Sequence, residues 1–193
     1  MFNKIWIGIT LLFVSILSDA QFYKSYLPST EFSDALASII IDFGNNYKNI
    51  QGDRISNEGT SETYSSRVVL PGALETYIYQ FKSSKDTTAS IQSVMYRGEN
   101  FKEAVKKYNE VFRLVKRTTV KWLDRSTVRF YGDFERPKEN VRFASSTLNL
   151  DFNDERYKKY KADIELISTY SGWEVHLNLH TKKEDYEKEG TYY

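Results

Sequence analysis

The sequence predicts an α+β protein in which an antiparallel sheet of about six strands packs on two amphipathic helices. Two segments repeat apolar residues at the spacing of one helix face, and three strand-like segments follow each of them. Aromatic residues make up 16% of the chain, with 15 Tyr and 12 Phe, and both types favour half-buried strands. The predicted order is therefore αβββ-αβββ. An internal duplication would explain this order, and so would two unrelated amphipathic helices that each precede strands.

The first 20 residues have the features of a secretory signal peptide. Lys4 is followed by an apolar segment, 5–17, and then by Ser18 and Ala20 at the positions that a signal peptidase reads. The apolar run is shorter than the roughly 20 residues that span a bilayer, so cleavage is expected and an uncleaved anchor is the alternative. The predicted organisation is a signal peptide at 1–20, a linker at 21–30, a single α+β domain at 31–183 and a solvated C-terminal tail at 184–193.

These features predict a periplasmic or secreted protein that contacts a membrane only through the signal segment before cleavage. A composition rich in Tyr, Asn, Lys and Ser, with Gln21 after the cleavage site, resembles that of exported proteins of Gram-negative bacteria of the Bacteroidota type. The absence of cysteine excludes disulfides, thiolate metal sites and a cysteine nucleophile. The net charge of +1 argues against a nucleic-acid partner, because nucleic-acid-binding domains are usually clearly basic.

The first predicted helix begins at Ser29-Thr30, directly after Pro28, and ends before Gly44. Its apolar face consists of Phe32, Ala35, Leu36, Ile39, Ile40 and Phe43. The segment that follows, 49–63, is rich in Gly, Ser, Asn and Thr, and it is predicted to be a mobile loop.

Three predicted strands follow this loop, at 64–70, 74–81 and 90–97. Between the first two, Pro71-Gly72 has the signature of a type II turn. A further turn is predicted at 83–89.

The second predicted helix starts after Asn100, which can cap it, with Glu103 three residues on as in a capping box. Its apolar face consists of Phe101, Ala104, Val105, Tyr108, Phe112 and Val115. After a connection with turns at Gly132 and Pro137 and room for one more strand, the last three predicted strands are 142–152, 160–168 and 173–181.

Both histidines of the chain, His176 and His180, lie in the last of these strands. Apolar residues alternate there with polar ones, so the two histidines are predicted to share one polar face. Four residues along a strand span about 13 Å, which is too far for two imidazoles to bind one metal ion. Each histidine stays a weak candidate for a metal site completed by neighbouring strands. The alternative is a solvated or cross-strand-paired histidine.

Motifs for other catalytic chemistries are missing from the sequence. There is no G-x-S-x-G nucleophile turn, no P-loop and no G-x-G-x-x-G. Acids at Asp133 with Glu135, and at Asp151 with Asp154 and Glu155, could serve a glycosidase only if the fold held them about 5 to 9 Å apart, and solvated loop acids are the alternative. We therefore assign no catalytic residue, and we expect no cofactor.

Binding is the function that these observations favour. Segment 101–129 holds nine basic and three acidic residues, so the second helix could present a basic surface to an anionic partner, or simply carry a solvated polar side. The candidate binding residues are Lys106, Lys107 and Arg113 of that helix, with the aromatic residues Tyr77, Tyr79, Phe81 and Tyr96 of the strands.

We expect an exported non-enzymatic protein that binds a protein, a ligand or an anionic component of the cell envelope. The first alternative is an exported hydrolase of a polysaccharide or peptide, assisted by a metal at His176 or His180. The second is a small carrier of an apolar ligand, with a closed cavity between the helices and the sheet.

Overall fold

A computed structural model describes residues 28–82, 87–122 and 125–181. The elements in chain order are α2 (Thr30–Asp42), η1 (Phe43–Asn45), β1 (Gln51–Glu58), β2 (Ser61–Ser66), β3 (Glu75–Lys82), β4 (Thr87–Gly98), α3 (Phe101–Arg117), β5 (Thr119–Lys121), β6 (Thr127–Tyr131), β7 (Phe143–Asp151), β8 (Tyr160–Thr169) and β9 (Gly172–Thr181). The predicted signal peptide at 1–20 and tail at 184–193 lie outside these residues, as does the predicted linker except for its last three residues.

The predicted fold class is wrong. The described residues form a mostly β structure, with 48% in strands and 22% in helices, and their strands make one nine-stranded antiparallel sheet instead of six strands on two helices. The helices are short, with 13 residues in α2 and 17 in α3. The order is helix, four strands, helix, five strands, so the predicted αβββ-αβββ order is not found.

The additional strands lie where the sequence carries weak signals. β1 occupies the segment predicted to be a mobile loop; it pairs only with β2 at the edge of the sheet, and five of its eight side chains are exposed. An edge strand that faces water on both sides needs no apolar alternation, so periodicity does not reveal it. β5 has three residues, too few to show a period.

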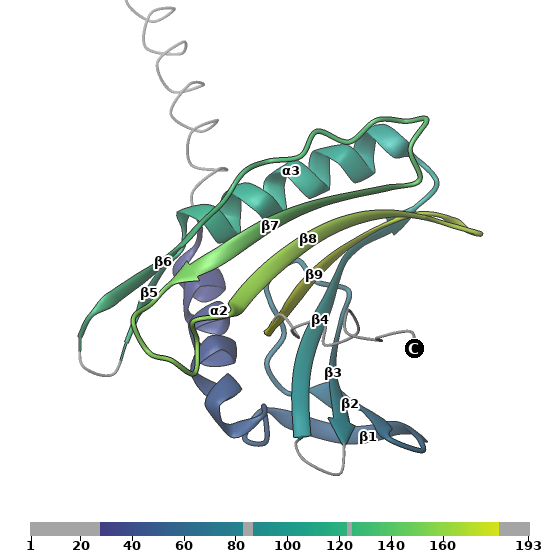
Figure 1. Ribbon diagram of the computed structural model, residues 1–193. Helices are drawn as coiled ribbons and strands as arrows, with labels where there is room; N and C mark the ends of the chain where they lie inside the picture. Colours follow the sequence, from purple (N-terminus) through teal and green to yellow (C-terminus); the bar gives the residue numbers. More distant parts are fainter. Residues whose placement is uncertain (1–27, 83–86, 123–124, 182–193) are drawn as a thin grey trace, which may run out of the picture.

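The sheet consists of two meanders that meet at their last strands. Its order is β1-β2-β3-β4-β9-β8-β7-β6-β5, so β4 and β9 join the two parts. The β4–β9 register pairs Gln92 with Asn178, and a bulge interrupts it between Val94 and Tyr96. Figure 1 shows the sheet bent into an arch, with α3 along its outer side.

The helix starts follow the predicted capping signals. The Ser29 side chain accepts a hydrogen bond from the backbone N–H of Phe32, and the Asn100 side chain accepts from Lys102 and Glu103. Such caps satisfy backbone donors that have no partner inside the helix. Among the residues that the structure describes, no helix is both long and apolar enough to cross a membrane.

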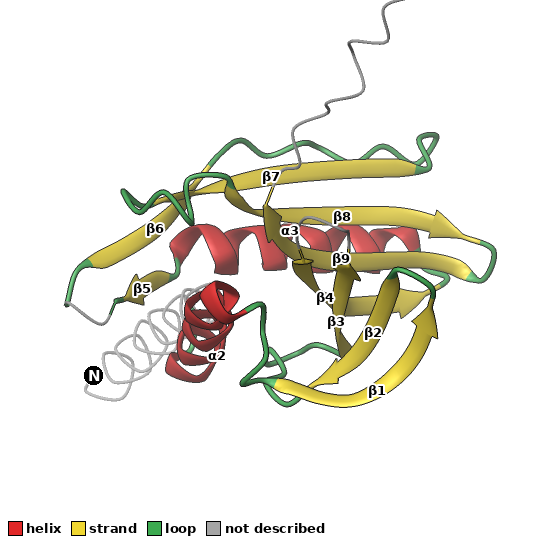
Figure 2. Ribbon diagram, turned by 60° about the horizontal axis from the view of Figure 1, so that its bottom comes forward, coloured by secondary structure: helices red, strands yellow, loops and turns green. Residues whose placement is uncertain are grey.

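Both helices contribute to one core on the outer face of the sheet. Figure 2 shows α3 behind β8 and β9, which it contacts. The strands other than β1 each turn one face towards this core; in β9 this face is formed by Val175, Leu177 and Leu179, which are buried. The alternate side chains of β9 therefore point to the opposite side, which we call the inner face because it lies inside the arch.

Candidate functional site

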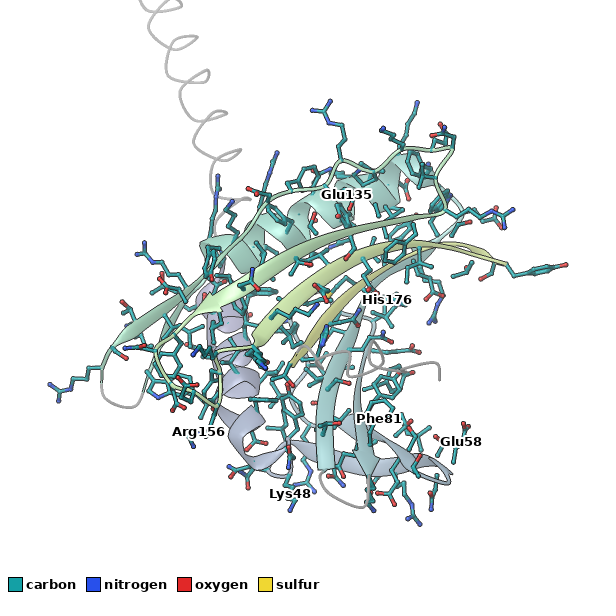
Figure 3. The ribbon with its side chains drawn as sticks, viewed as in Figure 1. Lys48, Glu58, Phe81, Glu135, Arg156 and His176 are labelled. Carbon is teal, nitrogen blue, oxygen red and sulfur yellow. The ribbon has the colours of Figure 1, made fainter. Side chains whose placement is uncertain are left out.

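The inner face carries a dense group of polar and aromatic side chains. Strand pairing places on this face Tyr77, Tyr79 and Phe81 of β3, Ser90 and Gln92 of β4, Thr147 of β7, Asp163 and Glu165 of β8, and His176, Asn178 and His180 of β9. Figure 3 shows His176 and Phe81 on the inner side of the arch. Apart from Phe81, which is 41% exposed, these residues are half-buried or buried, because the arch partly shields them from solvent.

A chain of hydrogen bonds crosses four strands of this face. The Tyr79 hydroxyl donates to Gln92 Oε1 over 3.3 Å, and Gln92 Nε2 donates to Asn178 Oδ1 over 2.9 Å. Asn178 Nδ2 in turn donates to Glu165 Oε2 over 2.7 Å. Because every bond runs in the same direction and ends on a carboxylate, the chain fixes the orientation of both amides.

His180 lies beside this chain and contacts Asp163. Its Nε2 is 2.7 Å from Asp163 Oδ2, and its Nδ1 is 3.1 Å from the carbonyl oxygen of Thr181. An ionised carboxylate can only accept, so Nε2 of His180 donates to Asp163.

Asp163 is the anchor of a second set of contacts. It also accepts a hydrogen bond from Thr147 Oγ1 over 2.6 Å, and Lys161 Nζ is 2.8 Å from its Oδ2. Burial alone would raise the pKa of Asp163, but hydrogen bonds from His180, Lys161 and Thr147 outweigh it and hold the pKa well below the usual range. Asp163 is thus ionised at neutral pH.

His176 belongs to a separate network at the other end of β9. Its Nε2 is 2.7 Å from Glu174 Oε2, and Arg97 bridges Glu174 to Glu75 over 2.9 and 3.3 Å. Burial acts to raise the pKa of Glu174, and hydrogen bonds with His176 and Arg97 lower it below its ordinary value. Within the described part of the chain, His176 Nδ1 is the one buried side-chain polar atom without a hydrogen-bond partner.

The two histidines lie as the alternation predicted, on one face of a strand, and each contacts a different carboxylate. Over residues 28–82, 87–122 and 125–181, no group of three or more His, Cys, Asp or Glu side chains could hold a metal ion. What the arrangement does provide is a set of side chains with fixed orientations, suited to binding.

A groove of about 490 Å³ lies on the inner face over β3, β4 and β9. The side chains that define it are Tyr79, Phe81, Ser90, Gln92, Asn178 and His180. The groove thus contains the amides of Gln92 and Asn178, the imidazole of His180 and the exposed aromatic ring of Phe81.

The structure separates the candidate binding residues into groups. Tyr77, Tyr79 and Phe81 lie together on the inner face, and the Tyr77 and Tyr79 rings are 6.5 Å apart. Lys106, Lys107 and Arg113 lie on α3, which packs on the outer face. The basic and aromatic residues therefore do not form one continuous surface.

Tyr96 lies apart from both groups, near the start of α3. Its hydroxyl is 3.3 Å from Glu103 Oε2 and 3.3 Å from the carbonyl oxygen of Asn100. The ring packs against the core, so Tyr96 helps to hold α3 on the sheet.

Gln92, Asn178, Asp163 and Glu165 are site residues that the sequence did not single out. Alternation alone places each of them on the polar side of its strand. Their meeting depends on the pairing of β4, β9 and β8, which no local signal specifies.

No protein-family model, curated protein or solved structure matches this chain. The geometry of the inner face is therefore the basis for a functional proposal.

Proposed function

We propose that this chain is an exported, non-enzymatic protein of the cell envelope that binds a ligand in the groove of its inner face. The observation that carries the proposal is the groove itself. Its volume lies within the range of small-molecule sites, about 300 to 1,000 Å³, and it combines exposed aromatic surface with a few polar groups held in place. Side chains that are already ordered lose little conformational entropy when a ligand binds.

Hydrolysis has weaker support from the geometry. A general base needs a free ring nitrogen that can take a proton from a nucleophile or a water. In His180, Nε2 is hydrogen-bonded to Asp163 and Nδ1 lies 3.1 Å from the carbonyl oxygen of Thr181, while His176 has Nε2 bonded to Glu174 and Nδ1 buried.

The acids considered for a glycosidase also have local partners. Glu135 accepts from the backbone N–H of Ser145, and Asp154 forms an ion pair with Arg156 over 2.7 Å. These contacts hold the loops in place, and they favour a structural role over a catalytic one for Glu135 and Asp154.

An apolar-ligand carrier is also less well supported. One continuous core of buried side chains lies between the helices and the sheet. The groove on the inner face combines apolar surface with amides, hydroxyls and an imidazole, and an apolar ligand would leave these polar groups without hydrogen-bond partners.

The proposal first predicts export. Expressed in a Gram-negative cell with its own first 20 residues, the protein should be recovered from the periplasm or medium with Gln21 at its N-terminus, as measured by mass spectrometry. Recovery of the uncleaved chain from the cytoplasm would contradict export. Recovery of the uncleaved chain from the membrane fraction would instead support the alternative of an uncleaved anchor.

The second expected result concerns the groove. Hydroxyl-radical footprinting of the purified mature protein should show that a soluble extract of the cell envelope lowers oxidation of Phe81. Phe143, a Phe of β7 on the same face but outside the groove, is the internal control and should react equally with and without extract. If protection appears on α3 instead, the basic surface of Lys106, Lys107 and Arg113 is the binding site, and Glu at these positions should abolish it.

A further inference from the structure

We infer that the groove of the inner face binds a neutral saccharide, an inference that rests on the proposed binding function of that groove. Three features of the groove carry it: the strands beneath it have no free backbone edge, its lining is almost uncharged, and its amides and aromatic ring match hydroxyl groups and an apolar sugar face.

The first feature concerns the backbone. β3, β4 and β9 each have a hydrogen-bonded neighbour on both sides, so their backbone N–H and C=O groups are used within the sheet. A peptide that binds as an added strand needs an exposed sheet edge, and the groove does not provide one. Recognition here must use side chains.

The second feature is the charge of the lining. Among the described residues that line the groove, none is Lys, Arg, Asp or Glu, and the imidazole of His180 is hydrogen-bonded to Asp163. An anionic or cationic ligand would lose its hydration without gaining an opposite charge. A neutral polar ligand meets no such penalty.

The third feature is the set of donors and acceptors on the two amides. Each primary amide has two N–H donors and two acceptor sites on its oxygen. The chain from Tyr79 to Glu165 uses one donor and one acceptor of Gln92, and one donor and one acceptor of Asn178. Both amides line the groove, and each keeps one donor and one acceptor that the chain does not use; these can pair with hydroxyl groups, which both donate and accept.

The aromatic ring supplies the complementary contact. Phe81 is 41% exposed at the end of β3, beside Thr88 of β4 in the strand register. One face of a pyranose ring presents C–H groups, and burying them against an aromatic ring removes apolar surface from water on both sides. A ligand with hydroxyls along its edge and C–H groups on its face therefore matches both parts of the groove.

The test uses the purified mature protein and neutral hexasaccharides of glucose, mannose, xylose and N-acetylglucosamine, with binding measured by isothermal titration calorimetry. At least one of them should bind the wild type. Phe81→Ala should weaken that binding by about ten- to hundredfold, while Phe81→Tyr, which keeps the ring, retains it. Phe143→Ala removes an exposed Phe from the same face outside the groove and should leave the affinity unchanged. Thermal melts of the three variants verify that each is folded.

The outcomes separate this inference from the proposed function. Three results would each overturn the inference of a neutral saccharide. They are absence of binding to all four hexasaccharides at millimolar concentration, tighter binding to a hexamer of glucuronate, and undiminished binding by Phe81→Ala. Protection of Phe81 by envelope extract should survive protease treatment and disappear after periodate oxidation of vicinal hydroxyls. If protease removes the protection, the ligand is a protein. The proposed binding function is then supported, and the inference of a saccharide ligand is wrong. If neither the extract nor any hexasaccharide protects Phe81, both the proposed binding function and the inference of a saccharide ligand are wrong.

Discussion

Replacing Asp163 by Ala lowers the free energy of unfolding by about 2–3 kcal/mol at neutral pH. The carboxylate is buried, and it receives contacts from His180, Lys161 and Thr147. Removing one member of a buried ion pair costs about 3–5 kcal/mol because the partner loses its counter-charge. The smaller value is expected here because the Lys161 and His180 side chains keep 19% and 29% exposure and regain some hydration. Urea unfolding of both proteins measures the difference.

The pH dependence of this effect has a definite sign. The folded pKa of Asp163 is depressed, so the unfolded chain binds more protons below about pH 4, the ordinary range of an aspartate. The contribution of Asp163 to stability is therefore complete above that pH and declines as the pH falls towards the folded pKa.

Asp163→Asn, which has the same shape and no charge, should be less stable than the wild type at pH 7, and the difference should shrink below pH 4. Asp133→Asn, at an exposed position, is the matched control and should change stability by less than about 0.5 kcal/mol. A difference that stays constant down to pH 2 would contradict the ion-pair account.

The elements that the sequence revealed are those with strong local signals. The caps at Ser29 and Asn100 and the apolar faces behind them located both helices. The strands β3, β4, β7, β8 and β9 lie where β-branched and aromatic residues or strict alternation indicated them. The predicted strand at 64–70 instead runs from Ser61 to Ser66, where the Ser66 hydroxyl is hydrogen-bonded to the backbone of Val68 in a local turn. β1 and β5, at the two sheet edges, had no such pattern and were missed.

The candidate site could be predicted only in part, because it depends on long-range pairing. Alternation in β9 was sufficient to place His176 and His180 on the polar face and to exclude a shared metal ion. The other residues of the groove were not predictable: Gln92 and Asn178, which are hydrogen-bonded across the β4–β9 junction, are 86 residues apart. The sequence also could not show whether the aromatic strand residues and the basic residues of α3 share one surface, since only the fold decides that α3 and the aromatic side chains of β3 lie on opposite faces.

Raising the pH above 10 unfolds the protein through its buried tyrosines. Tyr47 and Tyr160 are fully buried, and burial is the main cause that raises the pKa of each well above its ordinary value. Burial also raises the pKa of Tyr108 to about 12. In the unfolded chain all three lose protons near pH 10, whereas in the folded chain they do not. The unfolded state then binds fewer protons, so stability is unaffected below pH 10 and falls as the pH rises above it.

The size of this effect follows from the number of tyrosines. Each one contributes about 1.4 kcal/mol of lost stability per pH unit between its unfolded and folded pKa values. Three of them give about 4 kcal/mol per unit from pH 10 to 12, which approaches the total stability of about 5–15 kcal/mol that a domain has. Unfolding between pH 11 and 12, monitored by circular dichroism and by tyrosinate absorbance, is the expected result.

The double variant Tyr47→Phe and Tyr160→Phe tests the cause. The two hydroxyls are 3.2 Å apart and Tyr47 also donates to the carbonyl oxygen of Leu179, so removing both eliminates two titrating groups and leaves no hydroxyl without its partner. At pH 7 the double variant should lose only about 1 kcal/mol, since one carbonyl loses a donor. Above pH 10 its stability should fall less steeply than that of the wild type, by about 2.7 kcal/mol less per pH unit, because two titrating groups are gone. The single variant Tyr47→Phe leaves the Tyr160 hydroxyl buried without its partner and should lose more stability at pH 7 than the double variant.

Tyr170→Phe, at a fully exposed turn residue, is the control. The titration of lysines cancels in the comparison because all variants share it. If the double variant unfolds at the same alkaline pH as the wild type, the buried tyrosines are not what limits the fold at high pH.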